Sequence, residues 1–269
     1  MSAVPTAAVN GIELYYEQRG SGPRVLFVNG SGSTLAEAEL IVDVLAGSCE
    51  VLAHDQRGLG RTTIPPGPYT MANYAADAIA LLDHVGWERC AVVGISFGGM
   101  VAQELAVTRP EQIERLALLC TSPGGAGGSS YPVHELGDRS PAEQAAIGLG
   151  ILDTRFTPEW LASHPSDQAL VEMMVARRSR PDNEEQARGK AAQLGARAHH
   201  DVWDRLDRIT CPTLVAGGRF DGIAPSANSE AIASRISGAD LRFYEGGHAF
   251  LAQDPAAFPD VLAFLTAEA

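Results

Sequence analysis

The first half of the chain alternates short apolar runs with longer segments of helical periodicity. Residues 25–28 form an apolar run that ends at a glycine-rich turn, and residues 50–54 form a second such run. Between them, residues 35–46 place apolar side chains at helical spacing, so the pattern predicts a strand, a helix and a strand. The same reasoning predicts helices at 72–85 and 97–107 and strands at 90–93 and 116–120.

After residue 208 this alternation resumes. It predicts strands at 213–216 and 241–244, a helix at 227–235 and a last helix after Phe258. The leading segment 9–18 predicts an antiparallel edge hairpin that turns at Asn10 and Gly11. Strands buried on both faces and separated by helices are typical of a covered parallel sheet. We therefore expect an α/β fold with a mostly parallel eight-stranded sheet.

The strand pattern is interrupted between residues 122 and 208. A glycine- and serine-rich stretch at 123–130 leads into segments of helical periodicity. We expect residues 1–122 and 209–269 to form the core, and residues 123–208 to form a helical cap inserted after the sixth strand. The charged stretch 177–190 predicts a solvated helix face.

Charge and lysine content exclude several classes of function. The chain has 269 residues and a formal net charge of −13, which repels nucleic-acid phosphates and anionic lipid headgroups. We therefore expect neither a nucleic acid nor a membrane as a partner. Lys190 is the only lysine. A Schiff-base lysine or a phosphate-binding P-loop lysine would have to be this residue of a charged segment, which argues against both chemistries.

Cysteine usage and the N-terminal segment favour a cytoplasmic protein. The four cysteines stand singly, without a C-x-x-C pair or zinc-ligand spacing, so we expect reduced, buried thiols. Residues 1–20 lack the basic and apolar regions of a signal peptide, and no run reaches the length of a membrane span. The oligomeric state is left open.

The strongest chemical signal is a G-x-S-x-G motif, Gly94 to Gly98, with Ser96 at its centre. It directly follows a predicted strand and directly precedes a predicted helix. A turn this sharp strains the serine backbone and leaves no room for side chains at the flanking positions, which explains both glycines. Such a turn lifts the serine hydroxyl above the sheet, so Ser96 is predicted to be a nucleophile.

A serine nucleophile needs a base, and the base needs an acid that orients it. His248 follows the last predicted strand within a glycine-containing loop, and Asp221 follows the preceding strand. The order Ser96, Asp221, His248 is the one expected for this sheet topology. Glu245 and Asp254 are rival acids only through their nearness in sequence, and neither ends a strand.

Further motifs make the chain resemble the α/β-hydrolase superfamily over nearly its whole length. The segment Asp55 to Thr62 is similar to the family's D-x-R-G-x-G-x-[ST] turn, and Cys211 to Leu214 is similar to the segment ahead of the acid strand. The layout resembles that of small esterases, enol-lactonases and carbon–carbon bond hydrolases that carry a cap. The resemblance implies an α/β-hydrolase sheet and acyl-transfer chemistry. Because the elbow residue is a serine, it argues against relatives that attack through a carboxylate.

The resemblance also implies an oxyanion hole made by the backbone amides of Ser31 and Phe97. The family usually has His-Gly after its third strand, whereas this chain has Asn29 and Gly30. The donor at Ser31 is a backbone group, so the loss of the histidine side chain need not abolish the hole. A tight turn without a catalytic role is the alternative for this loop.

The expected function is hydrolysis of a carboxylic ester or lactone through an acyl-enzyme. Two alternatives stay open: a ligand-sensing or signalling protein on the same fold with slow turnover, and a carbon–carbon bond hydrolase. The scheme needs no cofactor. No metal site is predicted either, because the adjacent His199 and His200 cannot share a helix face.

The substrate pocket is expected between the carboxyl edge of the sheet and the cap. Its apolar candidates are Trp160, Met173, Met174 and Phe250, which favour a neutral, apolar small molecule as substrate. Packing within the cap's own core is the alternative for the cap residues Trp160, Leu161, Met173, Met174 and Trp203. Arg177 and Arg178 would reverse the charge preference only if they turned inward.

Overall fold

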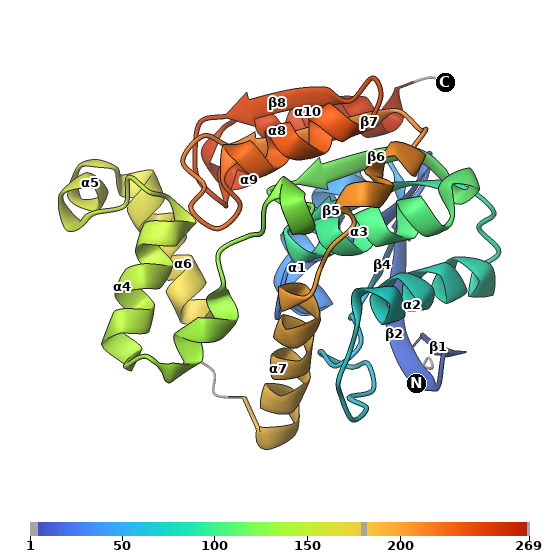
Figure 1. Cartoon of the computed structure of the whole chain (residues 1–269), viewed down its shortest axis with the longest axis horizontal. Coiled ribbons are helices and arrows are strands. Elements are labelled where there is room, and N and C mark those ends of the chain that lie inside the picture. The colour runs from blue at the N-terminus through green and yellow to red at the C-terminus, as the bar shows by residue number, and fades with distance from the viewer. Residues whose placement is uncertain (1–4, 179–181, 268–269) are drawn as a thin grey trace.

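The computed structural model describes residues 5–178 and 182–267, in which eight strands form one sheet (Figure 1). The strand order is β1-β2-β4-β3-β5-β6-β7-β8. The strands are β1 (Thr6–Val9), β2 (Ile12–Gly20), β3 (Arg24–Val28), β4 (Glu50–His54), β5 (Cys90–Ile95), β6 (Ile113–Leu119), β7 (Thr213–Gly218) and β8 (Asp240–Tyr244). Neighbours from β4 to β8 pair in parallel, and only the β1·β2 and β2·β4 pairs are antiparallel. The expected sheet is confirmed.

The helices follow the strands in the predicted alternation. They are α1 (Leu35–Ala46), α2 (Met71–His84), α3 (Phe97–Thr108), α4 (Pro141–Leu152), α5 (Pro158–Ser163), α6 (Pro165–Arg178), α7 (Glu184–Ala198), α8 (Ser226–Arg235), α9 (Phe250–Gln253) and α10 (Ala257–Thr266). Short 3-10 turns lie at Pro110–Gln112, Gly125–Gly127, Val133–Asp138 and Trp203–Arg208. Among the described residues, no helix is long and apolar enough to span a membrane.

Two hydrophobic clusters cover the two faces of the sheet. One joins the sheet to α2, α3 and α8 and contains the fully buried Trp87 and Leu105. The other joins it to α1 and α10 and contains Phe27 and Phe250. Figure 1 shows these helices in two layers with the strands between them. Burial on both faces explains why the central strands are almost continuously apolar.

The edge hairpin turns where the sequence predicts it. Asn10 and Gly11 both have positive φ, 46° and 76°, as the favoured two-residue hairpin turn requires. Glycine and asparagine adopt this backbone conformation most readily, so the dipeptide fixes the register in which β1 pairs with β2.

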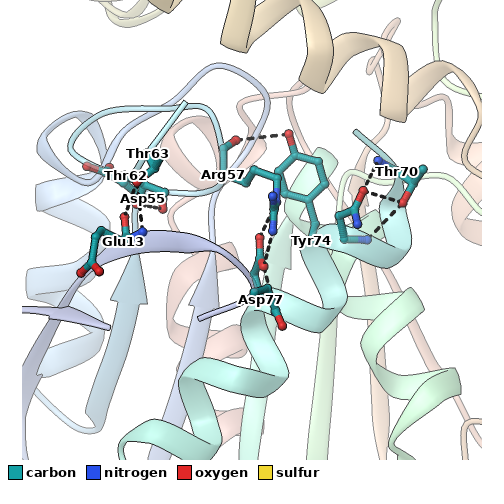
Figure 2. Close-up of polar contacts among 10 residues, drawn as sticks. Glu13, Asp55, Arg57, Thr62, Thr63, Thr70, Tyr74 and Asp77 are labelled. Carbon is teal, nitrogen blue, oxygen red and sulfur yellow. Dashed lines mark hydrogen bonds and ion pairs between the residues drawn. The ribbon is translucent and has the colours of Figure 1, made fainter. Parts of the chain in front are cut away.

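The turn after β4 holds the family-like segment that begins at Asp55 (Figure 2). The buried Arg57 guanidinium donates hydrogen bonds of 2.8 and 2.7 Å to the two carboxylate oxygens of Asp77 in α2. Tyr74 donates to the Arg57 carbonyl, and Thr62 donates to the Asp55 carbonyl. These bonds anchor the turn to α2 and leave it little freedom.

Between β6 and β7 the chain forms α4 to α7 and no strand among the residues that the structure describes there. In Figure 1, α4, α5 and α6 stand to one side of the sheet, and α7 returns toward it. A third, small hydrophobic cluster of Leu152, Phe156 and Leu161 lies within this segment. The boundaries 122/123 and 208/209 stay predictions. Trp203 was expected in the cap but packs against the core cluster beside α3 and α8, because its 3-10 turn has already returned to the sheet.

Candidate active site

The turn between β5 and α3 has the strained geometry that the sequence predicts. Ser96 has φ 56° and ψ −115°, a backbone conformation that L-residues rarely adopt. A Cβ at Gly94 would overlap the Gly98 carbonyl, and a Cβ at Gly98 would overlap the Val28 carbonyl. Both flanking positions must therefore be glycine. The Thr121 hydroxyl donates a 2.8 Å hydrogen bond to the Ser96 carbonyl and holds the turn from below.

Three side chains from three loops meet above this turn. His248 Nε2 lies 2.9 Å from Ser96 Oγ, and His248 Nδ1 lies 2.8 Å from Asp221 Oδ2. The structure thus brings the three predicted residues into one hydrogen-bonded chain. With Nδ1 protonated and donating to the carboxylate, Nε2 is free to accept the serine proton.

The acid is held by its own loop. Asp221 Oδ1 accepts hydrogen bonds of 2.8 Å from the amides of Ile223 and Ala224, while Oδ2 faces the imidazole. The residue is 4% exposed, so these bonds replace the water that a carboxylate would otherwise need. Of the rival acids, Asp254 accepts from the Glu245 amide instead, and the Glu245 carboxylate pairs with arginines.

The loop after β3 passes beside the nucleophile. A Cβ at Gly30 would lie 3.8 Å from Ser96 Cβ. Asn29, which stands where the family usually has histidine, folds back on the loop: its Oδ1 accepts from the Gly30 amide at 2.8 Å and its Nδ2 donates to the Thr34 carbonyl. The asparagine thus stabilises the loop. Neither the Ser31 nor the Phe97 amide has a hydrogen-bond acceptor among the described residues, and their oxyanion role stays a prediction.

The turn after β4 is hydrogen-bonded to the loop after β3, a contact that the sequence did not predict. Gln56 Nε2 donates a 2.9 Å hydrogen bond to the Asn29 carbonyl, and Asp55 accepts from the amides of Leu35 and Arg61. Burial raises the pKa of Asp55, and the two donating amides oppose that rise.

The segment between β6 and β7 holds the site from the opposite side. The Leu152 carbonyl accepts from the His248 amide at 2.6 Å, and the Ile151 carbonyl accepts from the Gly222 amide at 3.0 Å. On α7, the fully buried Gln193 accepts a 2.7 Å hydrogen bond from the Gly32 amide in the loop after β3. No local motif marks these residues, because two of them act through backbone atoms and the third through its distant partner.

One thiol lies against the candidate triad. Cys120, Asp221 and His248 present ligand-type atoms within 4.8 Å of one another. Burial raises the pKa of the Cys120 thiol well above its ordinary value. The pairing of Asp221 with His248 already accounts for the other two groups. All four cysteines are free, and Cys49, Cys90 and Cys120 are buried as expected, whereas Cys211 is only half-buried.

The role of the four predicted pocket residues stays a prediction, and the structure shows what each of them packs against. Phe250 is fully buried in a core cluster and stacks on Tyr244. Trp160 stacks on His164 and donates to Asp167, and Met174 packs with it against the small cluster between β6 and β7. Met173 is 40% exposed. Packing, the alternative considered for the cap side chains, accounts for Trp160 and Met174. The side chains of Arg177 and Arg178 lie outside the described residues.

Comparison with known proteins extends the resemblance to the α/β-hydrolases beyond the motifs. A family model described as the alpha/beta hydrolase fold matches residues 23–255. The chain is 28% identical over 260 residues to a 3-oxoadipate enol-lactonase of Acinetobacter baylyi, covering 94% of this chain and 92% of that protein. It is 30% identical over 258 residues to a protein of Variovorax paradoxus named for a proposed carbamate hydrolase activity, covering 91% and 92%.

A solved structure shows the same arrangement of elements. The enol-lactonase of Burkholderia xenovorans LB400 superposes with a TM-score of 0.79 at 27% identity, over 97% of this chain and all of that one. The family model spans most of the chain and includes the elbow serine and the loops of the acid and the base. This protein therefore belongs to the alpha/beta hydrolase fold family, and it is an enzyme of the hydrolase class.

Proposed function

We propose that this hydrolase cleaves a carboxylic ester or lactone through an acyl-enzyme on Ser96. The observation that carries the proposal is the hydrogen-bonded chain from Ser96 through His248 to Asp221, with contacts of 2.9 and 2.8 Å. A lactone is a cyclic ester, so one mechanism serves both substrates. The lactonase names among its relatives support this reaction type.

In the proposed mechanism, Ser96 Oγ attacks the substrate carbonyl carbon while His248 Nε2 takes the serine proton. The negative charge that develops on the carbonyl oxygen accepts hydrogen bonds from the amides of Ser31 and Phe97. Phe97 is the first residue of α3, so the helix dipole also favours this charge. His248 then protonates the leaving alcohol, and a water activated by the same imidazole releases the acid.

The predicted preference for neutral, apolar substrates lacks support from the packing of its four residues. Phe250 belongs to the core, and Trp160 and Met174 pack within the inserted segment. Our proposal therefore names the bond that is cleaved, an ester or lactone bond, and does not include a preference for neutral, apolar substrates. A cytoplasmic location and the absence of a nucleic-acid partner stay predictions.

The test begins with a fluorophosphonate probe, which labels a serine that a neighbouring base has activated. Wild-type protein should be labelled at Ser96, and Ser96→Ala should not. Protein that has not been treated with the probe is then assayed with 4-nitrophenyl butyrate, γ- and δ-lactones and a vinylogous diketone.

Continuous turnover of an ester or a lactone is the expected result. A single turnover followed by a stable adduct would support the ligand-sensing alternative instead. Cleavage of the diketone at a higher kcat/KM than every ester and lactone would favour carbon–carbon bond hydrolysis.

A further inference from the structure

A cavity with several polar side chains in its lining lies where the segment between β6 and β7 joins the core. Its volume is about 80 Å³, and its lining includes Met100, Ser122, Ser129, Arg197 and His200. This is several times the volume that one water needs. The candidate triad does not line it, so none of the chemistry above accounts for its polar groups.

Arg197 is a buried cation without a carboxylate partner among the described residues. It is 6% exposed, and its guanidinium donates a 2.9 Å hydrogen bond from Nη1 to the Tyr131 carbonyl. Burial lowers the pKa of Arg197 to about 10, and no acidic side chain among those that the structure describes offsets this effect. A buried charge without a counter-charge is costly for a folded protein. The remaining guanidinium donors are available to a ligand.

Two more buried polar side chains line the cavity. His200 makes no hydrogen bond of good geometry through either ring nitrogen in the described part of the chain, although its ring lies against the Ser122 backbone, and the Ser122 hydroxyl has no partner there. They are 5% and 1% exposed. Buried polar atoms nearly always have a partner in native proteins. Together with the remaining donors of Arg197, these two groups indicate that a polar ligand supplies the missing bonds.

The acidic side chains near the cavity have partners other than Arg197. Glu104, which lies near His200, accepts two hydrogen bonds of 2.7 and 2.8 Å from the Arg205 guanidinium. Asp201 Oδ1 accepts from the Trp203 amide. Neither carboxylate forms an ion pair with Arg197 among the described residues.

From this geometry we infer that the cavity is a binding site for a carboxylate group, held by Arg197 with Ser122 and His200. A guanidinium presents two parallel donors that match the two oxygens of a carboxylate. The hydroxyl and the neutral imidazole each add one donor. A monoanion balances the single positive charge, whereas a phosphate dianion would add an excess negative charge to a protein of net charge −13.

The position of the cavity relates it to the proposed reaction. Met100 lies one turn of α3 beyond Ser96, and its amide donates to the Ser96 carbonyl. Ser122 follows Thr121, whose hydroxyl bonds the same carbonyl. The carboxylate has two possible sources: a second acidic group on the substrate, or a free carboxylic acid such as the product of hydrolysis. The first source rests on the proposed function, and the second does not.

The experiment separates these sources in two arms. Calorimetry measures the binding of sodium butyrate and of butyramide, its neutral analogue, to wild-type protein, Arg197→Met and Ser122→Ala. Steady-state kinetics compares mono(4-nitrophenyl) glutarate with 4-nitrophenyl butyrate. Arg188→Met is the matched control, because Arg188 lies on the same helix and is exposed at the surface.

Carboxylate binding predicts that wild-type protein binds butyrate and not butyramide. Arg197→Met should weaken this binding at least tenfold, since a hydrogen bond to a charged group is worth about 1.5–3 kcal/mol. Ser122→Ala should weaken it severalfold without disturbing the fold, and Arg188→Met should leave it unchanged. If the carboxylate belongs to the substrate, Arg197→Met also lowers kcat/KM for the glutarate at least tenfold while sparing the butyrate ester.

The inference is overturned if butyrate and butyramide bind alike, or if Arg197→Met and Arg188→Met have the same effect in both arms. Hydrolysis of 4-nitrophenyl butyrate in that case would leave the proposed function standing. Conversely, charge-dependent butyrate binding by a protein that turns over no ester would support the site and contradict the proposed function.

Discussion

The sheet edge and the segment between β6 and β7 hold the candidate active site in different ways. At the sheet edge, the residue types themselves set the geometry, because Ser96 is flanked by glycines whose missing side chains let two backbones touch. On the opposite side, Ile151 and Leu152 contribute only carbonyl oxygens. The comparison teaches that the sheet edge depends on side-chain identity, whereas the end of α4 acts through the path of its backbone, and Gln193 is the side chain by which the segment between β6 and β7 adds to this support.

The largest expected effect concerns the sheet edge. Ser96→Ala removes the nucleophile and one oxygen, so kcat should fall by a factor on the order of 10⁶. The thermal midpoint should stay within a degree or two of the wild-type value. A variant that keeps more than a tenth of wild-type turnover would contradict the assignment of Ser96.

The next prediction tests whether Asp221 acts by holding the imidazole of His248 in the correct tautomer. Asp221→Asn keeps the shape but favours the wrong imidazole tautomer, so kcat should fall by about 10⁴ with little change in KM. Asp254→Asn is the control, since Asp254 bonds the Glu245 and Ala256 amides and does not contact His248. Equal losses in the two variants would show that Asp221 is not the acid.

A pH series compares the two regions directly, because each buries one histidine. Burial lowers the pKa of His54, in β4, and of His200, after α7, from 6.5 to about 4. Between these values the unfolded chain binds more protons than the folded one, so the free energy of unfolding falls as the pH drops from about 6.5 to 4. Each histidine should account for a loss on the order of 3 kcal/mol.

Urea unfolding of wild-type protein, His54→Leu and His200→Leu at pH 7 and pH 4.5 measures this effect. Each variant should lose less stability on acidification than wild-type protein does. A common unfolding transition in all three would show that the two regions unfold together. Identical pH dependence in the variants and the wild type would rule out the proposed origin of the slope.

The smallest expected effect concerns the contact between the acid loop after β7 and the end of α4. A Cβ at Gly222 would lie 2.8 Å from Ile151 Cα, whereas a Cβ at Gly148 in α4 would meet nothing within 4 Å. Gly222→Ala should therefore cost about 1–3 kcal/mol and lower kcat, because the acid loop must move. Gly148→Ala should add about 0.5–1 kcal/mol and keep kcat. Thermal unfolding and kcat measure both, and equal behaviour of the two variants would contradict the close contact.

The sheet and the three candidate residues could be predicted because local rules decide them. Apolar runs buried on both faces identify strands, and Ser96, Asp221 and His248 each follow a strand whose carboxyl end lies at the same sheet edge. Asn10 and Gly11 fix the hairpin for an equally local reason.

The packing of the segment between β6 and β7 could be predicted only in part. Hydrophobic periodicity indicates that one face of a helix is buried, but it does not indicate which element packs against that face. Trp203 and Phe250 were expected at the cap or its pocket, and both pack with the core. The short helix α9 (Phe250–Gln253) is too brief to leave a periodic pattern. Gln193 and Arg197 have meaning only beside their partners, which lie 161 and 66 residues away.

The two carbonyls at the end of α4 limit how this segment could be exchanged with that of another hydrolase. A carbonyl oxygen is common to all residues, so the side chains at positions 151 and 152 need only suit their own packing, which for Leu152 is the small hydrophobic cluster, while the oxygens must not move. A chimaeric enzyme would hold its acid and base loops only if the grafted helix ended at the same height above Gly222 and His248. The end point of that helix, more than its sequence, is what a designer of such chimaeras must preserve.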